Sequence, residues 1–416
     1  MHQGTVSSPD RLIISLSDHL IALPDLRPMD SSMTVGVVGA GTMGSGIAQV
    51  AAQAGHPVVL YDTRLEALDK AKAALAKVMG RLVEKGNLDR EEAEAIQGRI
   101  TYATGLEAFI GSGLVIEAIV EDLQVKQDLF KQLEDIVGPD AVLGTNTSSL
   151  SVTAIGGALS RPGRLLGLHF FNPAPLLPLV EVVPGLATEP GLASQLTSLM
   201  KAWGKVPVIA KDTPGFIVNR VARPFYGEAL RILEEGLADA ATIDHAMRTV
   251  GGFRMGPFEL MDLIGNDVNF AVTRTVFEAF FYDPRYRPSF TQQRLVEAGW
   301  LGRKSGRGYY HHAEGAERPA PTDDVILHEQ ICWRILVMLI NEAVDALYLG
   351  VAERDDLELA MTKGVNYPKG LLGWADEKGL PHCLETLERL QDEYGEDRYR
   401  PSPLLRRMVR EGRTFF

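Results

Sequence analysis

The sequence predicts an α/β domain with a mostly parallel sheet, followed by two tandem all-helical domains. Between residues 34 and 210, short apolar runs alternate with helical patterns, as expected of parallel strands joined by helical crossovers. Beyond residue 213 the patterns are helical, and one helical segment recurs later in the chain. With 416 residues, the chain is also too long for a single hydrophobic core.

The composition narrows the class of protein. The chain is 45% hydrophobic and 23% charged, which is typical of globular proteins, and its net charge of -12 argues against a nucleic-acid partner. No apolar run reaches the roughly 18 residues of a membrane span, so we expect no membrane partner. The two cysteines, Cys332 and Cys383, exclude a disulfide scaffold and fit a reducing, cytoplasmic compartment.

Four boundaries follow from these patterns. Residues 1–32 lack the basic start and apolar centre of a signal peptide, and we expect them to form a poorly ordered leader. We expect the sheet domain at 33–212, the first helical domain at 213–311, a proline- and glycine-containing linker at 312–324 and the second helical domain at 325–416.

The first predicted strand, Thr34–Val38, leads into a glycine-rich turn. This turn, Gly39–Gly44, reads Gly-Ala-Gly-Thr-Met-Gly and opens a helix that runs to about Ala54. The next strand, Val58–Tyr61, ends in Asp62. Strand, glycines, helix, strand and terminal acid in this order predict a Rossmann-type dinucleotide-binding site.

Each part of this turn has a predicted role. Gly39 permits the tight turn, Gly41 lets the backbone approach a pyrophosphate, and Gly44 lets the helix pack closely on the strand. Asp62 would bond the ribose 2′-hydroxyl and repel a 2′-phosphate, which favours NAD over NADP. The cofactor-binding residues predicted here also include Thr42 and Met43.

The helix predicted over Leu65–Lys85 has two distinct faces. Its expected buried stripe comprises Leu68, Ala71, Leu75, Val78 and Leu82. Lys70, Lys77 and Arg81 share another face, which is either a solvated surface or a docking stripe for a polyanionic ligand.

Polar residues follow the next two predicted strands, Leu114–Ala118 and Ala141–Thr145. Glu121 and Lys126 come after the first strand, and Asn146–Ser149 after the second. Ligands of open α/β sheets bind beyond the carboxyl ends of the strands, so these residues are candidates for a site. Taken singly, each is more often an ordinary loop residue.

A histidine and a glutamate lie on the next two predicted strands. His169 belongs to Leu165–Phe171 and Glu181 to Leu179–Val183, and a loop with three prolines joins the two runs. A histidine held by a carboxylate is a common general base near neutral pH. From this stretch alone, a core histidine with an exposed glutamate is the alternative. Val206–Ala210 is the last predicted strand.

The helical half begins with a predicted N-cap at Thr213 and Pro214 in the first helical position. Pro224 should kink the helix that follows. A shift of 114 residues aligns Ile217–Gly265 with Ile331–Gly379 without a gap, and twelve of the 49 positions are identical. One helical unit is therefore duplicated, although the second copy has Trp333 where the first has Asn219.

Several motifs in one order carry a family resemblance. These are the glycine turn with Asp62, E-D-L-Q-V-K, N-T-S-S-L, G-L-H-F-F-N-P and T-P-G-F-I-V-N-R. Together they resemble the NAD-dependent 3-hydroxyacyl-CoA dehydrogenases, whose fold is a Rossmann domain followed by helical C-terminal domains. The doubled helical half, with G-V-N-Y-P-K-G and G-E-D-R-Y-R-P, is similar to the members that act on 3-hydroxyadipyl-CoA in phenylacetate catabolism. One departure is Pro178, where many members carry lysine.

The resemblance implies a role for each motif. His169 would take the proton of the 3-hydroxyl while hydride leaves C3 for the nicotinamide, and Glu181 would orient the imidazole. Ser148 and Asn219 would hold the developing carbonyl and the thioester. The cofactor would contact Glu121, Lys126, Asn146, Ser148, Asn172 and Lys304. The CoA moiety would run over Lys70, Lys77 and Arg81. No metal is expected.

Arg223 lies four residues after Asn219, so on a helix both side chains point the same way. It is a candidate for binding the distal carboxylate of a substrate such as 3-hydroxyadipyl-CoA. A surface arginine, or a salt bridge to Glu228, is the alternative.

Other functions and partners stay open from the sequence. One is a 3-hydroxybutyryl-CoA dehydrogenase of short-chain fatty acid metabolism, and another is a non-catalytic dinucleotide-binding relative, such as a sensor or a crystallin. Dehydrogenases of free 3-hydroxyacids share the glycine turn but rely on a catalytic lysine. Besides the acyl-CoA substrate, a homo-oligomer stays open, and we expect the two helical domains of one chain to form an internal pseudo-dimer.

Overall fold

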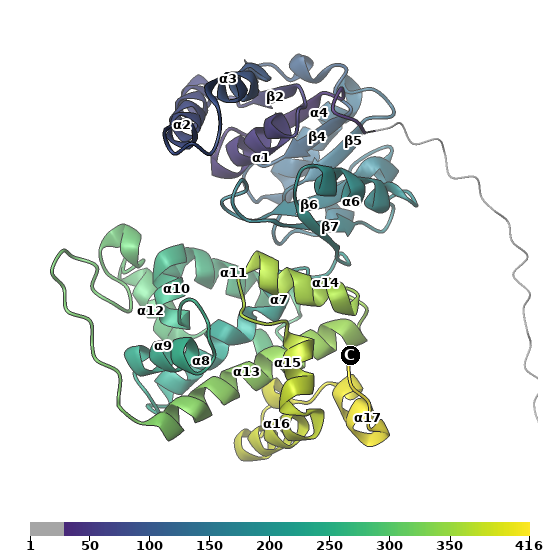
Figure 1. Ribbon diagram of the computed structural model, residues 1–416. Helices are drawn as coiled ribbons and strands as arrows, with labels where there is room; N and C mark the ends of the chain where they lie inside the picture. The colour runs from purple at the N-terminus through teal and green to yellow at the C-terminus, as the bar shows by residue number, and fades with distance from the viewer. Residues whose placement is uncertain (1–28) are drawn as a thin grey trace, which may run out of the picture.

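The computed structural model describes residues 29–416, and it has two halves. The upper half in Figure 1 is a sheet covered by helices, and the lower half is entirely helical. Most of the predicted leader, residues 1–28, lies outside the described residues.

One eight-stranded sheet in the order β3-β2-β1-β4-β5-β6-β7-β8 forms the centre of the upper half. All neighbouring strands are parallel except β6 and β7, which run antiparallel. Its strands are β1 (Val35–Val38), β2 (Val58–Tyr61), β3 (Ile100–Ala103), β4 (Leu114–Glu117), β5 (Val142–Thr145), β6 (Leu165–Phe170), β7 (Leu179–Pro184) and β8 (Val206–Ile209). Every predicted strand is present, and the sequence reading missed only β3.

Helices cover both faces of this sheet (Figure 1). They are α1 (Thr42–Gln53), α2 (Leu65–Glu84), α3 (Arg90–Gly98), α4 (Leu123–Ile136), α5 (Val152–Gly156) and α6 (Leu192–Ala202). The predicted stripe of α2 is correct at Leu68, Ala71 and Leu75 but wrong at Val78, which is exposed. Met79 is buried instead, because a step of four residues after Leu75 keeps the buried face in line with the helical period.

The helical half contains two consecutive copies joined by an extended linker. The first copy holds α7 (Val218–Val221), α8 (Arg223–Glu234), α9 (Ala240–Thr249), α10 (Pro257–Ile264), α11 (Asn266–Ala279) and α12 (Phe290–Glu297). The second holds α13 (Val325–Tyr348), α14 (Arg354–Leu359), α15 (Leu371–Lys378), α16 (Leu380–Tyr394) and α17 (Pro403–Glu411), with a π-helical turn at Ala360–Gly364. None of the helices within residues 29–416 is long and apolar enough to span a membrane.

The predicted helix start at Thr213 and Pro214 is wrong. Gly215 and Phe216 take positive φ values of 73° and 47°, so the chain turns there and α7 begins only at Val218. At the kink predicted for Pro224, the helix divides into α7 and α8 at Ala222, whose dihedrals stay in the right-handed region at φ -81° and ψ -9°.

The same polar contacts shape both copies. Asp244 accepts hydrogen bonds from the backbone N–H groups of Phe258 and Glu259 at the start of α10. At the matching position, 114 residues on, Glu358 accepts from Leu372 and Gly373 at the start of α15. The duplication is therefore visible in the capping of equivalent helices as well as in their order.

The two copies pack against each other through reciprocal ion pairs. Arg220 of the first copy lies 2.6 Å from Glu342 of the second, and the matching Arg334 lies 2.6 Å from Glu228. Tyrosine hydroxyls add a second bond on each side, from Tyr286 to Glu342 and from Tyr399 to Glu228. This exchange relates the copies by an approximate two-fold axis between α8 and α13.

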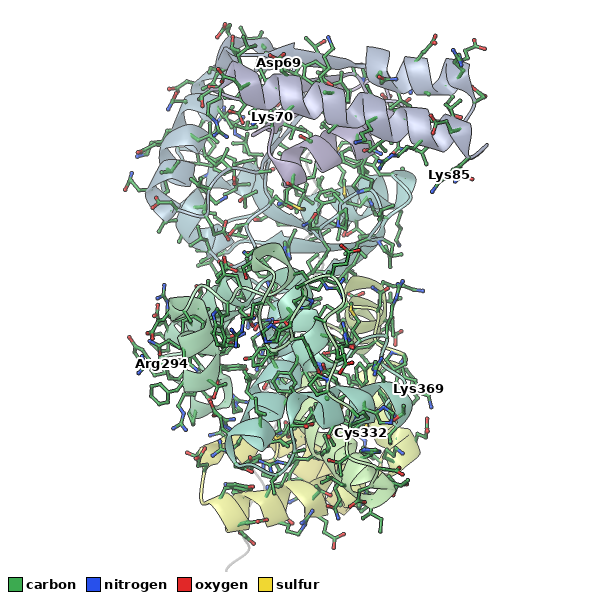
Figure 2. The ribbon with its side chains drawn as sticks, turned by 90° about the vertical axis from the view of Figure 1, so that its left-hand side faces the viewer. Asp69, Lys70, Lys85, Arg294, Cys332 and Lys369 are labelled. Carbon is green, nitrogen blue, oxygen red and sulfur yellow. The ribbon has the colours of Figure 1, made fainter. Side chains whose placement is uncertain are left out.

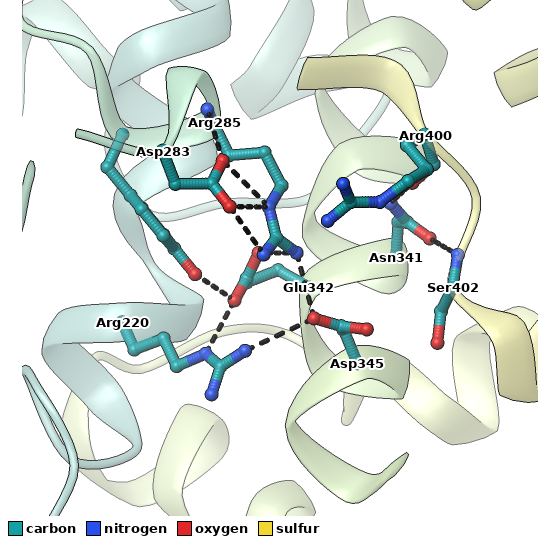
Figure 3. A network of polar contacts seen from close by, with 9 residues as sticks. Arg220, Asp283, Arg285, Asn341, Glu342, Asp345, Arg400 and Ser402 are labelled. Atoms are coloured by element: carbon teal, nitrogen blue, oxygen red, sulfur yellow. Dashed lines mark hydrogen bonds and ion pairs between the residues drawn. The ribbon is translucent and has the colours of Figure 1, made fainter. Parts of the chain in front are cut away.

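Figure 3 shows Arg220 and Arg285 converging on the two carboxylates of α13, Glu342 and Asp345. All four side chains are buried. Burial alone would lower the pKa of Arg220, but Glu342 outweighs that effect and raises it. Both carboxylate partners of Arg220 come from the other copy, whereas Arg285 also pairs with Asp283 of its own copy.

The cysteines lie inside the second copy. Cys332, marked in Figure 2, and Cys383 are both buried and unpaired. Burial raises the pKa of their thiols to about 11 and about 12, so both are weakly nucleophilic near neutral pH.

The second copy also packs on the sheet domain. The Lys211 N–H donates to the carbonyl of Val351, and the Ile209 N–H donates to Asp356. Gly364 lies so close to Leu179 of β7 that an added Cβ would be 2.5 Å from its side chain. The last strands of the sheet are therefore packed against the second copy.

We predict that Glu342→Gln lowers the free energy of unfolding by about 3–5 kcal/mol, because it leaves two buried arginines short of a negative charge. Urea unfolding measures this difference. Glu278→Gln is the matched control, since Glu278 forms an exposed pair with Arg274 and its loss should leave stability nearly unchanged. Equal stability of the two variants would contradict a role for the network in holding the copies together.

Candidate active site

His169 and Glu181 are directly opposed in the antiparallel pair of β6 and β7. The Nδ1 atom of His169 lies 2.6 Å from Oε2 of Glu181, and both side chains are buried. The alternative of an exposed glutamate is excluded. Because the carboxylate takes Nδ1, the opposite ring nitrogen, Nε2, is the one available for chemistry.

The other oxygen of Glu181 binds the helical half. Its Oε1 accepts hydrogen bonds of 3.0 and 2.9 Å from the backbone N–H groups of Ile217 and Val218. These two N–H groups face the carboxylate because the chain turns at Gly215 and Phe216. Three hydrogen bonds thus compensate the buried charge and fix its orientation.

Neighbouring groups hold the imidazole and the loop after it. The rings of Phe171 and Phe216 lie 4.5 and 5.9 Å from the His169 ring, measured between centroids. The buried ammonium of Lys205 donates to the carbonyls of Ala174 and Leu177 in the loop between β6 and β7. Sequence reasoning missed Lys205, which shares no motif with the loop that it binds.

A cavity of about 490 Å³ lies where His169 meets the helical half. It is lined by residues of the sheet domain, of α7, α8 and α11, and of the second copy, which contributes Val365. The residues predicted for the site that line it are Met43, Glu121, Asn146, Ser148, His169, Asn172, Asn219 and Arg223.

Ser148 and Asn219 meet on one side of this cavity. The Asn219 side-chain amide donates to the backbone carbonyl of Ser148 at 3.2 Å, which joins the tip of β5 to α7. Asn146, at the same tip, accepts a hydrogen bond from the Phe170 N–H. The strand-tip residues are thus held together by contacts among themselves.

Glu121 organises the loop that carries Ser148. Its Oε1 accepts from the Thr147 hydroxyl and from the N–H groups of Ser148 and Ser149. Burial alone would raise the pKa of Glu121, but Lys126 and these hydrogen bonds outweigh it and lower the pKa. Glu121 is therefore an anion that shapes the loop.

The structure places Lys126 behind the site. Its ammonium is buried, 2.5 Å from Glu117 and 3.3 Å from Glu121, and the side chain does not line the cavity. Glu117, at the end of β4, also accepts from Thr145. Sequence reasoning missed Glu117, because its acidic side chain ends an otherwise apolar strand and has no motif of its own.

The glycine turn fits a dinucleotide. Gly39 has a φ of +100°, and a Cβ there would lie 2.6 Å from the Ala118 carbonyl, while one on Gly44 would lie 1.8 Å from the Gly39 carbonyl. A Cβ on Gly41 would meet no atom within 4 Å. Gly39 and Gly44 are therefore required by the fold, whereas Gly41 leaves room for a ligand, as predicted for a pyrophosphate.

Asp62 sits at the end of β2 and helps to form this turn. Its two oxygens accept from the N–H groups of Ala40 and Arg64, each at 2.9 Å. A carboxylate has further lone pairs, so a ribose hydroxyl can bind as well.

Lys304 lies apart from the cavity. Its ammonium pairs with Asp267 at 2.6 Å within the first helical copy, and it is not among the residues that line the cavity. The structure therefore does not bring Lys304 to the same place as the other predicted cofactor residues.

The basic face of α2 is exposed, as Figure 2 shows for Lys70. The side chains of Lys70, Lys77 and Arg81 form no hydrogen bond or ion pair with another residue of the described part of the chain. None of them lines the cavity. Within residues 29–416, no three metal-ligating side chains gather.

Arg223 is buried and lines the cavity, so the alternative of a surface arginine is wrong. A salt bridge to Glu228 is also absent, because Glu228 binds Arg334 and Tyr399. Arg223 instead donates to the hydroxyl of Thr273 at 3.1 Å.

Comparisons with known proteins agree with this geometry. Residues 34–213 match the family model of the 3-hydroxyacyl-CoA dehydrogenase NAD-binding domain. Residues 215–312 and again 331–414 match the C-terminal domain of the same family. The chain is a 3-hydroxyacyl-CoA dehydrogenase family member. It is an oxidoreductase whose sheet domain binds NAD.

Relatives of the dehydrogenase differ in their named substrates. A 3-hydroxyadipyl-CoA dehydrogenase of Escherichia coli is 42% identical over 91% of this chain and 98% of its own. A probable 3-hydroxybutyryl-CoA dehydrogenase of Deinococcus radiodurans is 44% identical over 67% of this chain and all of its own. The crystal structure of a 3-hydroxybutyryl-CoA dehydrogenase from Escherichia coli K12 matches with a TM-score of 0.87 and 40% identity, over 92% and 99% of the two chains.

We predict that Gly41→Val weakens NADH binding roughly tenfold or more while the unliganded enzyme keeps its melting temperature, because the new side chain fills only ligand space. NADH fluorescence titration and thermal unfolding measure the two effects. Gly44→Ala is the control, and it should lower the melting temperature itself. Undiminished NADH affinity in Gly41→Val would contradict the placement of the pyrophosphate.

Proposed function

We propose that this dehydrogenase oxidises (S)-3-hydroxyacyl-CoA to 3-oxoacyl-CoA, with His169 and Glu181 as its general base pair. The observation that carries this proposal is the buried contact between His169 and Glu181 at the wall of the cavity. NAD, when bound at the glycine turn, accepts the hydride from C3 of the substrate.

Proton transfer follows from the way the imidazole is held. Glu181 accepts the Nδ1–H of His169, which leaves an unprotonated Nε2 toward the cavity. Nε2 takes the proton of the 3-hydroxyl, and the resulting imidazolium is stabilised by the adjacent carboxylate. Glu181 keeps its own charge because Ile217 and Val218 donate to its second oxygen.

Ser148 and Asn219 hold the substrate in this proposal. Both line the same cavity as His169, and the contact between them fixes their spacing. The Ser148 hydroxyl and the Asn219 amide are donors for the developing C3 carbonyl and the thioester oxygen. Glu121 supports this arrangement by binding the backbone of the loop that carries Ser148.

The remaining predicted contacts are part of the proposal. The exposed basic face of α2 attracts the phosphates of CoA. Asn146 and Asn172 lie where the nicotinamide end of NAD would enter the cavity, and Lys126 acts through Glu121. The reducing cytoplasm is the expected compartment.

For the acyl group, 3-hydroxyadipyl-CoA is the first candidate. The relative with that name shares both helical copies, since the match covers 98% of its length. 3-Hydroxybutyryl-CoA is the second candidate, because a solved relative over 92% of this chain bears that name. A role in phenylacetate catabolism would follow from the first.

We predict that Glu181→Gln lowers kcat by about 10²–10⁴ although it preserves the shape of the site. The new amide can donate to Nδ1 of His169, which moves the ring proton to Nε2 and removes the base. Steady-state formation of NADH from 3-hydroxyacyl-CoA measures this loss. His169→Gln should lower kcat to a similar extent.

The control is NADH affinity, which should stay near wild type in both variants, because neither residue is part of the glycine turn. A parallel loss of NADH affinity would show that His169 and Glu181 maintain the fold and are not the general base pair. A wild-type enzyme that oxidised no 3-hydroxyacyl-CoA would support the non-catalytic alternative.

A further inference from the structure

Arg223 is a buried cation with no anion beside it. No carboxylate of residues 29–416 lies within ion-pair distance, and its Nε has no hydrogen-bond partner. Its one hydrogen bond goes to the neutral hydroxyl of Thr273. The other arginines inside the helical half all have a carboxylate within ion-pair distance: Arg220, Arg285, Arg334 and Arg398. An unpaired buried charge is costly, so its position in the cavity wall needs a reason.

Two tyrosines accompany this arginine. The Arg223 guanidinium lies 5.0 Å from the ring centre of Tyr226, which also lines the cavity. Tyr367, from the second copy, has a buried hydroxyl without a hydrogen-bond partner. Burial raises the pKa of Tyr367 well above its usual value, so this hydroxyl keeps its proton and is a donor. Arg223 lines the cavity, and Tyr367 is buried close to it without lining the cavity, so two unused donors lie near each other.

The duplication supplies an internal comparison. At the positions 114 residues after Arg223, Tyr226 and Thr273, the second copy has Val337, Ile340 and Leu387. The scaffold is therefore stable with apolar side chains at all three positions. Tyr367 corresponds to Phe253, and the two rings touch with their centres 5.0 Å apart. Of these two rings, only that of Tyr367 carries a hydroxyl, and Tyr367 is the one with Arg223 as a polar neighbour.

We propose that Arg223, Tyr226, Thr273 and Tyr367 form a carboxylate-binding subsite for the distal end of a dicarboxylic 3-hydroxyacyl thioester. This proposal rests on the proposed function and adds the substrate class. A carboxylate there would accept from the guanidinium and from the two tyrosine hydroxyls, while the Thr273 hydroxyl donates to the Asn269 carbonyl. Thr273 orients the guanidinium through its hydrogen bond, and the carboxylate supplies the missing negative charge.

The length of the subsite suits a six-carbon chain. Asn219 and Arg223 both line the cavity, and Arg223 follows Asn219 by four residues, which is about one helical turn. In 3-hydroxyadipyl-CoA, three carbon–carbon bonds of about 1.5 Å separate the reacting carbon from the carboxylate. Such a chain reaches from the reacting centre to the next turn of the helix.

The second helical copy closes this end of the cavity. Val365 lines it, and Gly364 packs against Leu179 and Val218 at the base of the catalytic strands. Tyr367 follows two residues after Val365 on the same segment. The duplicated domain thereby supplies both a wall and a donor of the subsite.

The test compares two thioesters of equal length, 3-hydroxyadipyl-CoA and 3-hydroxyhexanoyl-CoA, on wild type, Arg223→Met and Tyr367→Phe. We expect wild type to favour the dicarboxylic substrate. Arg223→Met should lower kcat/KM for 3-hydroxyadipyl-CoA by about 10- to 150-fold. The same variant should leave kcat/KM for 3-hydroxyhexanoyl-CoA unchanged or raise it. Tyr367→Phe, which copies Phe253, should lower only the dicarboxylic value, by about 3- to 10-fold. Arg274→Met on the exposed face of α11 is the control and should change neither.

Thermal unfolding separates binding from structure. Tyr367→Phe removes an unpaired buried hydroxyl, so its melting temperature should be equal to or above that of wild type. Equal losses on both thioesters in Arg223→Met, or a wild type that prefers 3-hydroxyhexanoyl-CoA, would overturn the subsite and leave the proposed function standing. A wild type inactive on both thioesters would overturn the two together.

Discussion

One buried carboxylate, that of Glu181, joins the catalytic strand to the helical half of the enzyme. Its two oxygens bind on opposite sides, one to His169 and one to the backbone N–H groups of Ile217 and Val218. A charge in this position is tolerable only while all three donors are in place. The orientation of the general base and the seating of α7 against the sheet therefore depend on the same hydrogen bonds.

This constraint explains the irregular chain between the two halves. The positive φ of Phe216 is unfavourable for a bulky side chain, and such strain persists where the surroundings compensate for it. Here the turn aims two N–H groups at Glu181 and packs the Phe216 ring against His169. A regular helix from Thr213 would have directed these N–H groups into its own ladder.

The sequence predicted most of the sheet and the catalytic pair because both depend on short-range patterns. Buried parallel strands are continuous apolar runs, whereas the missed edge strand β3, Ile-Thr-Tyr-Ala, is only partly buried. The helix start at Thr213 was misplaced because a distant residue, Glu181, decides it. The surroundings of Arg223 could not be predicted either, since Thr273 and Tyr367 approach it from 50 and 144 residues along the chain.

The duplicated domain separates residues that hold the copies together from residues that face the substrate. Arg220 and Glu228 recur as Arg334 and Glu342, because each copy must supply the partner of the other's buried charge. Asn219 does not recur: it lines the cavity, whereas the matching Trp333 does not and is stacked on His382 of the second copy. The second copy builds no site at the position that matches Asn219, so it is free to lose the polar side chain there, but not those that pair across the two-fold. The second copy is thus a built-in partner subunit that has kept its interface and given up its own site.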